Sequence, residues 1–85
     1  MDPADNKRRS PRMRTMKGAS VILPGSASAF SCVMRNLSEH GALVELPSTI
    51  GIPGAVILQT QDGTLNRHCR VVWRTEVRLG LEFTD

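Results

Sequence analysis

Residues 29–37 read Ala-Phe-Ser-Cys-Val-Met-Arg-Asn-Leu, and the pattern of this stretch decides the fold. Phe30, Cys32 and Met34 occupy every second position, while Ser31 belongs to the opposite face. This period of two predicts a β-strand that turns one face toward a core. No segment of the chain shows a convincing helical period, so the sequence predicts an all-β protein.

The same alternation recurs on both sides of this segment, separated by Gly, Pro and Asp-Gly turn signals. We expect six strands, over residues 16–23, 29–37, 42–46, 55–59, 67–74 and 78–84. Six short antiparallel strands must protect their edges, and closure into a small barrel does so. In the fifth strand, Cys69, Val71 and Trp73 share one face, so Trp73 is expected to anchor the core.

The chain has 85 residues, which is one small domain. Its longest apolar runs are far shorter than the roughly 18–20 residues of a membrane span, and no signal-peptide core follows the N-terminal charges. We therefore expect a cytoplasmic protein without membrane insertion.

The positive charge of the chain is concentrated at its N-terminus. Residues 1–20 hold six basic and two acidic side chains, whereas residues 21–85 hold five basic and six acidic ones. Residues 1–15 show no apolar periodicity, so we expect a flexible basic arm over 1–15 and a barrel domain over 16–85. Such an arm either solubilises the protein or binds an anion, and arginine suits phosphate or the edge of a guanine base.

The residues that could carry catalysis or bind a metal form no recognisable constellation. His40 and His68 are far apart in sequence, and no Ser, His and Asp pattern resembles a nucleophilic triad. Cys32 and Cys69 fall on inward positions, where thiols act as small apolar side chains. We therefore expect no catalytic residue, no metal site and no cofactor.

Two short motifs remain. Arg8 and Arg12 form an RxxxR pattern in the arm, and residues 36–41 read Asn-Leu-Ser-Glu-His-Gly, an NxSxxG pattern between the second and third strands. Alone, the second motif is plausible turn chemistry, with Asn and Ser capping amides and Gly taking a positive φ. Together and in this order, the motifs indicate a binding site.

In these motifs the chain resembles the PilZ domain family, over about residues 7–84. The resemblance includes the RRSPR arm, residues 33–38, Gly41-Ala42, residues 69–74 and the Leu-Gly-Leu-Glu-Phe ending at 79–83. It implies a six-stranded antiparallel barrel of the split type that binds cyclic di-GMP. The C-terminal helix of many relatives is not expected here, since the sequence given ends at Asp85, just after the last strand. His40 stands where many members have a small residue, at a position that the motif leaves open.

The resemblance also implies the ligand-binding residues. Arg8 and Arg12 would clasp the ligand with Arg9 adjacent, and the surface beneath the ligand would be lined by Asn36, Ser38 and Gly41. Their chemistry suits this ligand, because Arg meets O6 and N7 of guanine and Asn can read the N1, N2 and O6 edge. The dianion would order the arm over the barrel and present a new surface to an effector protein.

Two other functions stay open. A PilZ-like barrel could bind no nucleotide and act as a protein-interaction adaptor. A basic barrel could also bind nucleic acid through its arm, but Phe30, Trp73 and Phe83 all alternate inward and leave no stacking surface, so no specific nucleic acid is expected. An enzyme is the least favoured reading.

Overall fold

Six antiparallel strands make up the fold in the computed structural model, which describes residues 13–25 and 28–85, with side chains from residue 16 on. The strands are β1 (Met13–Ile22), β2 (Ala29–Leu37), β3 (Gly41–Glu45), β4 (Ala55–Thr60), β5 (Asn66–Arg74) and β6 (Arg78–Phe83). The described residues contain no helix. The all-β prediction is confirmed.

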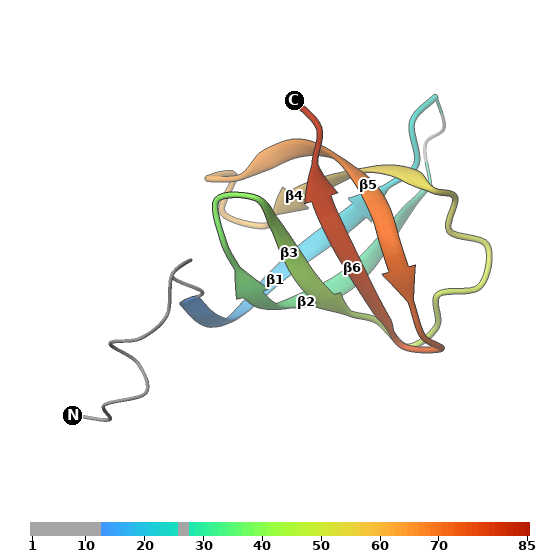
Figure 1. Ribbon diagram of the computed structural model, residues 1–85, viewed down its shortest axis with the longest axis horizontal. Coiled ribbons are helices and arrows are strands. Elements are labelled where there is room, and N and C mark those ends of the chain that lie inside the picture. Colours follow the sequence, from blue (N-terminus) through green and yellow to red (C-terminus); the bar gives the residue numbers. More distant parts are fainter. Residues whose placement is uncertain (1–12, 26–27) are drawn as a thin grey trace.

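The strands close into a barrel in the order β1-β2-β3-β6-β5-β4 (Figure 1). Neighbours in the chain form two three-stranded meanders, β1–β2–β3 and β4–β5–β6. The β3–β6 and β1–β4 ladders join the meanders along two seams. Both seams are antiparallel, so the predicted six-stranded antiparallel barrel is confirmed and no strand edge is left open at a seam.

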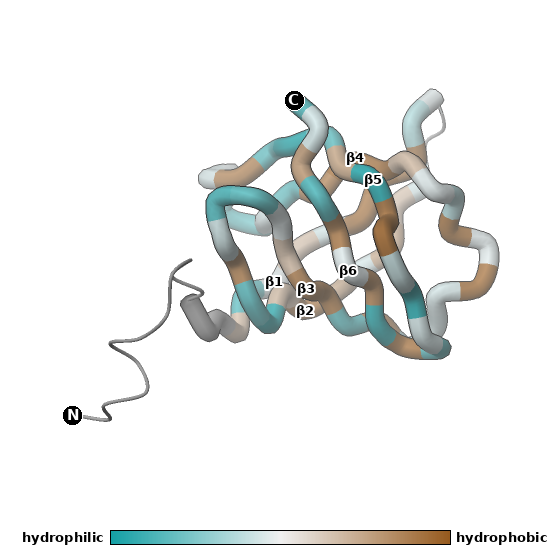
Figure 2. The backbone as a smooth tube through the Cα atoms, in the orientation of Figure 1, coloured by the Kyte–Doolittle hydropathy of each residue, from teal (hydrophilic) through white to brown (hydrophobic). Residues whose placement is uncertain are grey.

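The barrel interior is filled by alternate side chains of every strand, a pattern that Figure 2 shows as alternating hydropathy along the tube. Met34, Val44, Leu58 and Leu79 are among its most deeply buried members. Both cysteines are free thiols in this core, and burial raises the pKa of each to about 11. Such thiols stay protonated and pack as small apolar groups, as their inward positions predicted.

The ends of five strands fall within one residue of their predicted positions. The exception is β1, which begins at Met13 rather than at residue 16 because its first residues pair with the end of β2, Met13 opposite Leu37. A register shift between Arg14 and Lys17 interrupts this ladder, and it also breaks the period of two on which the prediction relied. The rest of the predicted arm, residues 1–12, lies outside the described residues, so the domain boundary remains a prediction.

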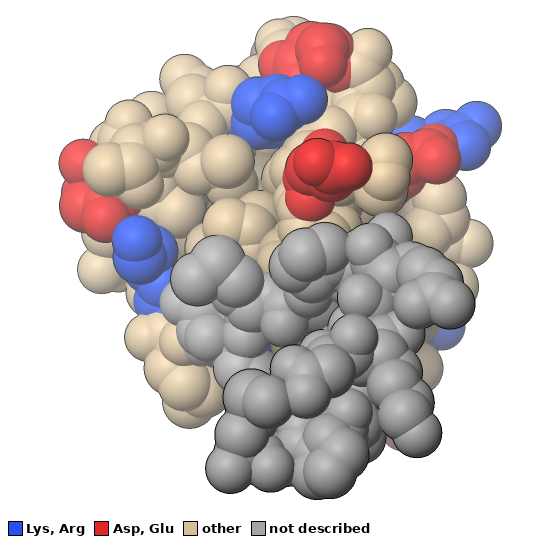
Figure 3. Space-filling model, turned by 60° about the vertical axis from the view of Figure 1, so that its left-hand side comes forward, with Lys and Arg blue, Asp and Glu red and all other residues tan. Residues whose placement is uncertain are grey.

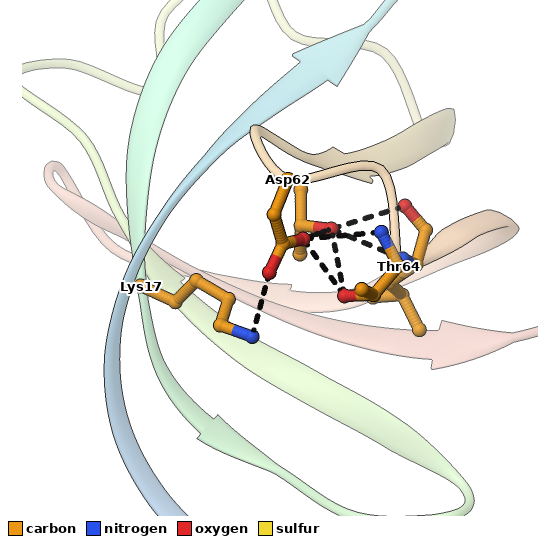
Figure 4. A network of polar contacts seen from close by, with 5 residues as sticks. Lys17, Asp62 and Thr64 are labelled. Carbon is orange, nitrogen blue, oxygen red and sulfur yellow. Dashed lines mark hydrogen bonds and ion pairs between the residues drawn. The ribbon is translucent and has the colours of Figure 1, made fainter.

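Asp62 organises the turn between β4 and β5 (Figure 4). Its carboxylate accepts hydrogen bonds from the backbone N–H and hydroxyl of Thr64, from the hydroxyl of Thr60 and, at 3.1 Å, from the Lys17 ammonium on β1. These donors, the Thr64 amide foremost, hold the pKa of Asp62 well below its ordinary value. Because Lys17 belongs to the strand that closes the barrel against β4, the turn is tied to the β1–β4 seam.

Asp62→Asn is expected to make the fold less sensitive to acid. A carboxyl whose pKa is lowered on folding stabilises the native state above its unfolded pKa of about 3.9, and this contribution is lost as the pH falls further. The substitution should therefore lower the melting temperature at neutral pH, and the difference from the parent should shrink between about pH 4 and pH 2. Thermal melts across this range measure it.

Glu76→Gln serves as the control for that series, because the Glu76 side chain is exposed and makes no hydrogen bond to the described residues. Its melting temperature should follow the parent at every pH. If the gap between Asp62→Asn and the parent stayed constant down to pH 2, the Asp62 network would contribute nothing to acid stability.

Candidate ligand-binding groove

An open groove of about 320 Å³ lies on the outer surface of the barrel. Its walls come from the end of β2, the β2–β3 turn, β3, β5 and β6. β3, β6 and β5 lie side by side on the near face in Figure 1. The lining residues are Asn36, Leu37, Ser38, His40, Gly41, Ala42, Leu43, Val72, Trp73, Gly80, Leu81 and Glu82. The structure thus brings Asn36, Ser38 and Gly41, the three specified positions of the NxSxxG motif, into one groove.

Ser38 builds the turn at one end of this groove. Its hydroxyl oxygen accepts hydrogen bonds from the backbone N–H of His40 at 3.2 Å and of Gly41 at 3.3 Å. Its own backbone N–H donates to the Gly41 carbonyl at 2.9 Å. The motif serine is therefore a turn cap in the ligand-free protein, a role that the sequence left open beside ligand contact.

Gly41 is the position where the third strand meets β6. The interpretation of the motif as a turn gives Gly41 a positive φ, which the structure does not show: the described glycines with positive φ are Gly25, Gly51 and Gly63. Glycine is needed at position 41 for a different reason, because a Cβ there would overlap the Leu81 carbonyl oxygen and lie 3.0 Å from the carbonyl carbon. Glycine at this position allows the backbones of β3 and β6 to approach closely where they line the groove.

Asn36 lies half-buried near the end of β2, where the strand changes register against β3. Its backbone pairs with Leu43 on β3 and with Arg14 on β1. Its side chain lines the groove, so its amide can offer both a donor and an acceptor to a ligand. The polar His40 side chain lies on the rim and is largely exposed, with its Nε2 3.5 Å from Glu39 Oε1.

Trp73 lies on the outer face of the barrel, so its predicted place in the core is wrong. A bulge between Val71 and Trp73 shifts the register of β5 against β6 and reverses the alternation beyond it. The indole is 47% exposed and lies across Gly80, where an added Cβ would overlap its ring. The groove therefore has an aromatic wall. The expectation that Trp73 points inward and leaves no stacking surface is wrong.

Trp73→Ala is expected to lower stability by much less than the about 3–5 kcal/mol that truncation of a buried aromatic costs. Because the indole is exposed, its removal costs mainly the contacts that it makes with β6 at Gly80. Thermal or denaturant unfolding measures the change. Leu79→Ala, at a fully buried position of the neighbouring strand, should cost about 2–5 kcal/mol in the same assay. A loss for Trp73→Ala as large as for Leu79→Ala would contradict the exposed position.

The basic side chains described on the barrel are already engaged. Arg35 and Arg78 bind Glu45, Arg67 binds Asp85, and Arg70 binds Glu82. Arg74 donates to the carbonyls of Thr49 and Ile52. The pKa of Glu45 is lowered mainly by its hydrogen bond from Arg78, and that of Asp85 by Arg67. On the face in Figure 3, basic and acidic side chains lie interspersed over the described surface. The ion pairs leave an anion little unpaired positive charge among the described side chains.

The predicted arginines Arg8, Arg9 and Arg12 lie outside the described residues. Chain connectivity still limits where they can reach, because Arg12 precedes Met13, and Met13 is paired with Leu37 in the groove wall. Five Cα–Cα steps separate Arg8 from Met13, and a fully extended chain spans at most about 18 Å over them. The described part of the chain therefore begins beside the groove.

Between residues 13 and 85, apart from 26 and 27, no three His, Cys, Asp or Glu side chains are grouped to hold a metal ion. The same part of the chain contains no helix that is long and apolar enough to span a membrane.

A closed six-stranded barrel with an open polar and aromatic groove on its outer wall defines a small binding module. A comparison with protein families gives the particular family: the PilZ domain matches residues 6–85, so the chain belongs to the PilZ domain family. PilZ domains are binding or adaptor domains and are generally associated with cyclic di-GMP. A comparison with curated proteins found no match.

Proposed function

We propose that this protein is a cytoplasmic receptor for cyclic di-GMP that binds the nucleotide in the groove and signals to an effector protein. The observation that carries the proposal is the extent of the PilZ match, which includes both the arginine arm and the groove residues. The groove side chains and the arginines of the arm support the proposal, because they suit the bases and the phosphates of this ligand.

The groove suits the bases of the ligand. A purine has a flat π-face, and an exposed indole can stack on it with about 1–3 kcal/mol per base. Trp73 offers such a face, and Gly41 lines the same groove without a side chain. The Asn36 amide can hydrogen-bond the edge of a stacked guanine.

The phosphates need positive charge that the described barrel does not supply. The five arginines whose side chains the structure describes are all hydrogen-bonded within the protein, whereas the arm carries Arg8, Arg9 and Arg12. Guanidinium groups bind phosphate and the O6 and N7 edge of guanine through paired hydrogen bonds. The ligand thus neutralises the arm and holds it against the groove, and the ordered arm becomes a new surface for the effector.

Calorimetric titration with cyclic di-GMP tests the proposal, with GMP and single-stranded DNA as controls. The chain has one tryptophan, so the fluorescence of Trp73 provides an independent signal from the groove itself. We expect saturable heat and a change in Trp73 emission with cyclic di-GMP, and much weaker responses to both controls.

Two outcomes of the titration would contradict the proposal, and each would favour a different function. Absence of binding would leave the second reading, a PilZ barrel that acts as a protein-interaction adaptor without nucleotide. Equal or stronger binding of single-stranded DNA would show that the basic arm and Trp73 serve nucleic acid instead.

A further inference from the structure

Glu82 borders the groove from β6 and has a different neighbour on each side. Leu81, beside it in the strand, is buried, and Glu82 itself is exposed on the outer face. Across the sheet, Glu82 is paired with Gly41 on β3 and with Arg70 on β5. Gly41 offers Glu82 no side-chain partner, so its side-chain neighbour across the sheet is the Arg70 guanidinium.

Arg70 holds this carboxylate in place by donating a hydrogen bond from Nη2 to Glu82 Oε1. The Arg70 and Glu82 side chains are 63% and 47% exposed, and an ion pair in such contact with water contributes little to stability. Its effect on the groove is larger, because the guanidinium cancels the negative charge that would otherwise repel an anionic ligand. The Arg70–Glu82 pair as a whole carries no net charge, and the Glu82 carboxylate remains a fixed hydrogen-bond acceptor.

Glu82 also differs from the other groove side chains that carry polar atoms, which are Asn36, Ser38, His40 and, through its indole N–H donor, Trp73. The Ser38 hydroxyl is engaged in the β2–β3 turn. The Asn36 amide and a neutral imidazole each carry a donor as well as an acceptor, whereas an ionised carboxylate only accepts. Among the described groove residues, Glu82 is therefore the one side chain that requires a donor from its ligand.

The two purines differ in this respect. Guanine presents two adjacent donors, N1–H and the N2 amino group, whose spacing matches a carboxylate. Adenine presents a lone pair at N1 and carries its only amino group at N6. A carboxylate that meets the adenine N1 lone pair loses a hydrogen bond and gains a repulsive contact, and such mismatches are a general source of specificity.

We propose that Glu82, positioned by Arg70, selects guanine over adenine by accepting hydrogen bonds from N1–H and the N2 amino group of one base. The inference rests on the proposed function, because it concerns a base of the same dinucleotide. It assigns to β6 a specificity that neither the arginine arm nor the NxSxxG motif supplies. Asn36 remains available to the second guanine.

The test compares cyclic di-GMP with cyclic di-AMP, which has the same ring of phosphates and riboses and differs only in its bases. Wild-type protein should prefer cyclic di-GMP. Glu82→Gln should weaken cyclic di-GMP binding by about tenfold or more, the effect of losing a charge-assisted hydrogen bond. It should also strengthen cyclic di-AMP binding, because a glutamine amide can donate to adenine N1 and accept from N6.

Glu45→Gln is the matched control. Glu45 is likewise held by arginines on the barrel surface but does not line the groove, so its substitution should leave the preference for guanine unchanged. Glu82→Ala is the second variant, and it should lose cyclic di-GMP affinity without gaining affinity for cyclic di-AMP. Melts without ligand should place all three variants near the parent.

The outcomes separate this inference from the proposed function. If wild type binds cyclic di-GMP and both Glu82 variants keep its preference over cyclic di-AMP, the role of Glu82 is overturned and the receptor function stands. If wild type binds neither dinucleotide, the receptor function itself is overturned. Tighter cyclic di-GMP binding by Glu82→Gln would show that the carboxylate repels the ligand, which also contradicts the inference.

Discussion

Gly41→Ala is expected to cost about 3 kcal/mol or more of folding free energy, at the upper end of what added bulk costs in a packed structure. The new Cβ would overlap the Leu81 carbonyl oxygen, which belongs to the backbone of β6 and cannot rotate away. Relief requires β3 and β6 to separate along their ladder, from Gly41–Glu82 to Glu45–Arg78. A loss of this size is a large share of the stability of a small domain.

Denaturant unfolding of the variant measures this loss, and Gly54→Ala is its control. Gly54 has no positive φ, and an added Cβ there meets nothing within 4 Å. That substitution should change the free energy of unfolding by about 0.5 kcal/mol at most. Equal stability of the two variants would mean that β3 and β6 tolerate a wider spacing at Gly41.

The second large effect concerns the arm. Replacing both Arg8 and Arg12 with Ala should reduce cyclic di-GMP affinity by more than a hundredfold, since each hydrogen bond to a charged group contributes about 1.5–3 kcal/mol. The melting temperature without ligand should barely change, because the buried core lies between Ala19 and Leu81. Calorimetric titration and thermal melts of the same sample measure the two quantities.

Lys17→Ala removes one positive charge at the start of the described barrel and is the control for the arm. Lys17 binds Asp62 and does not line the groove, so its loss should change affinity only slightly and mainly through salt-dependent attraction. Single variants at Arg8, Arg9 and Arg12 then show which guanidinium groups contribute. Parental affinity in the double variant would remove the arm from the binding site.

The six strands could be predicted because burial imposes a period of two on the sequence. The alternation of Cys32 and Met34 with Val33, and of Leu79 and Leu81 with Gly80 and Glu82, fixes strand type and face from local information alone. Closure of the barrel followed from the need to protect six short strands. Pairing partners across the seams could not be predicted, because they depend on residues far apart in the chain.

The wrong predictions for Trp73 and Gly41 share a physical cause. A local sequence pattern does not determine how one strand is aligned against its neighbour. The bulge before Trp73 adds one residue to β5 against β6, and no residue type at this point of the sequence predicts a bulge. Gly41 was identified as special for a turn conformation, although the reason is the nearness of Leu81 on another strand. Glu82 could not be singled out from the sequence, because its position beside Gly41 exists only once β3 and β6 are paired.

Each three-stranded meander joins strands that are neighbours in the chain, whereas the β3–β6 and β1–β4 seams close much longer loops. Long loops cost more entropy to close, so we expect the seams to form after the meanders during folding. The groove straddles the β3–β6 seam, with Asn36 and Leu43 on one half and Trp73 and Glu82 on the other. A nucleotide bound there links the two halves non-covalently. It therefore slows their separation, and amide hydrogen exchange should become slowest along β3 and β6.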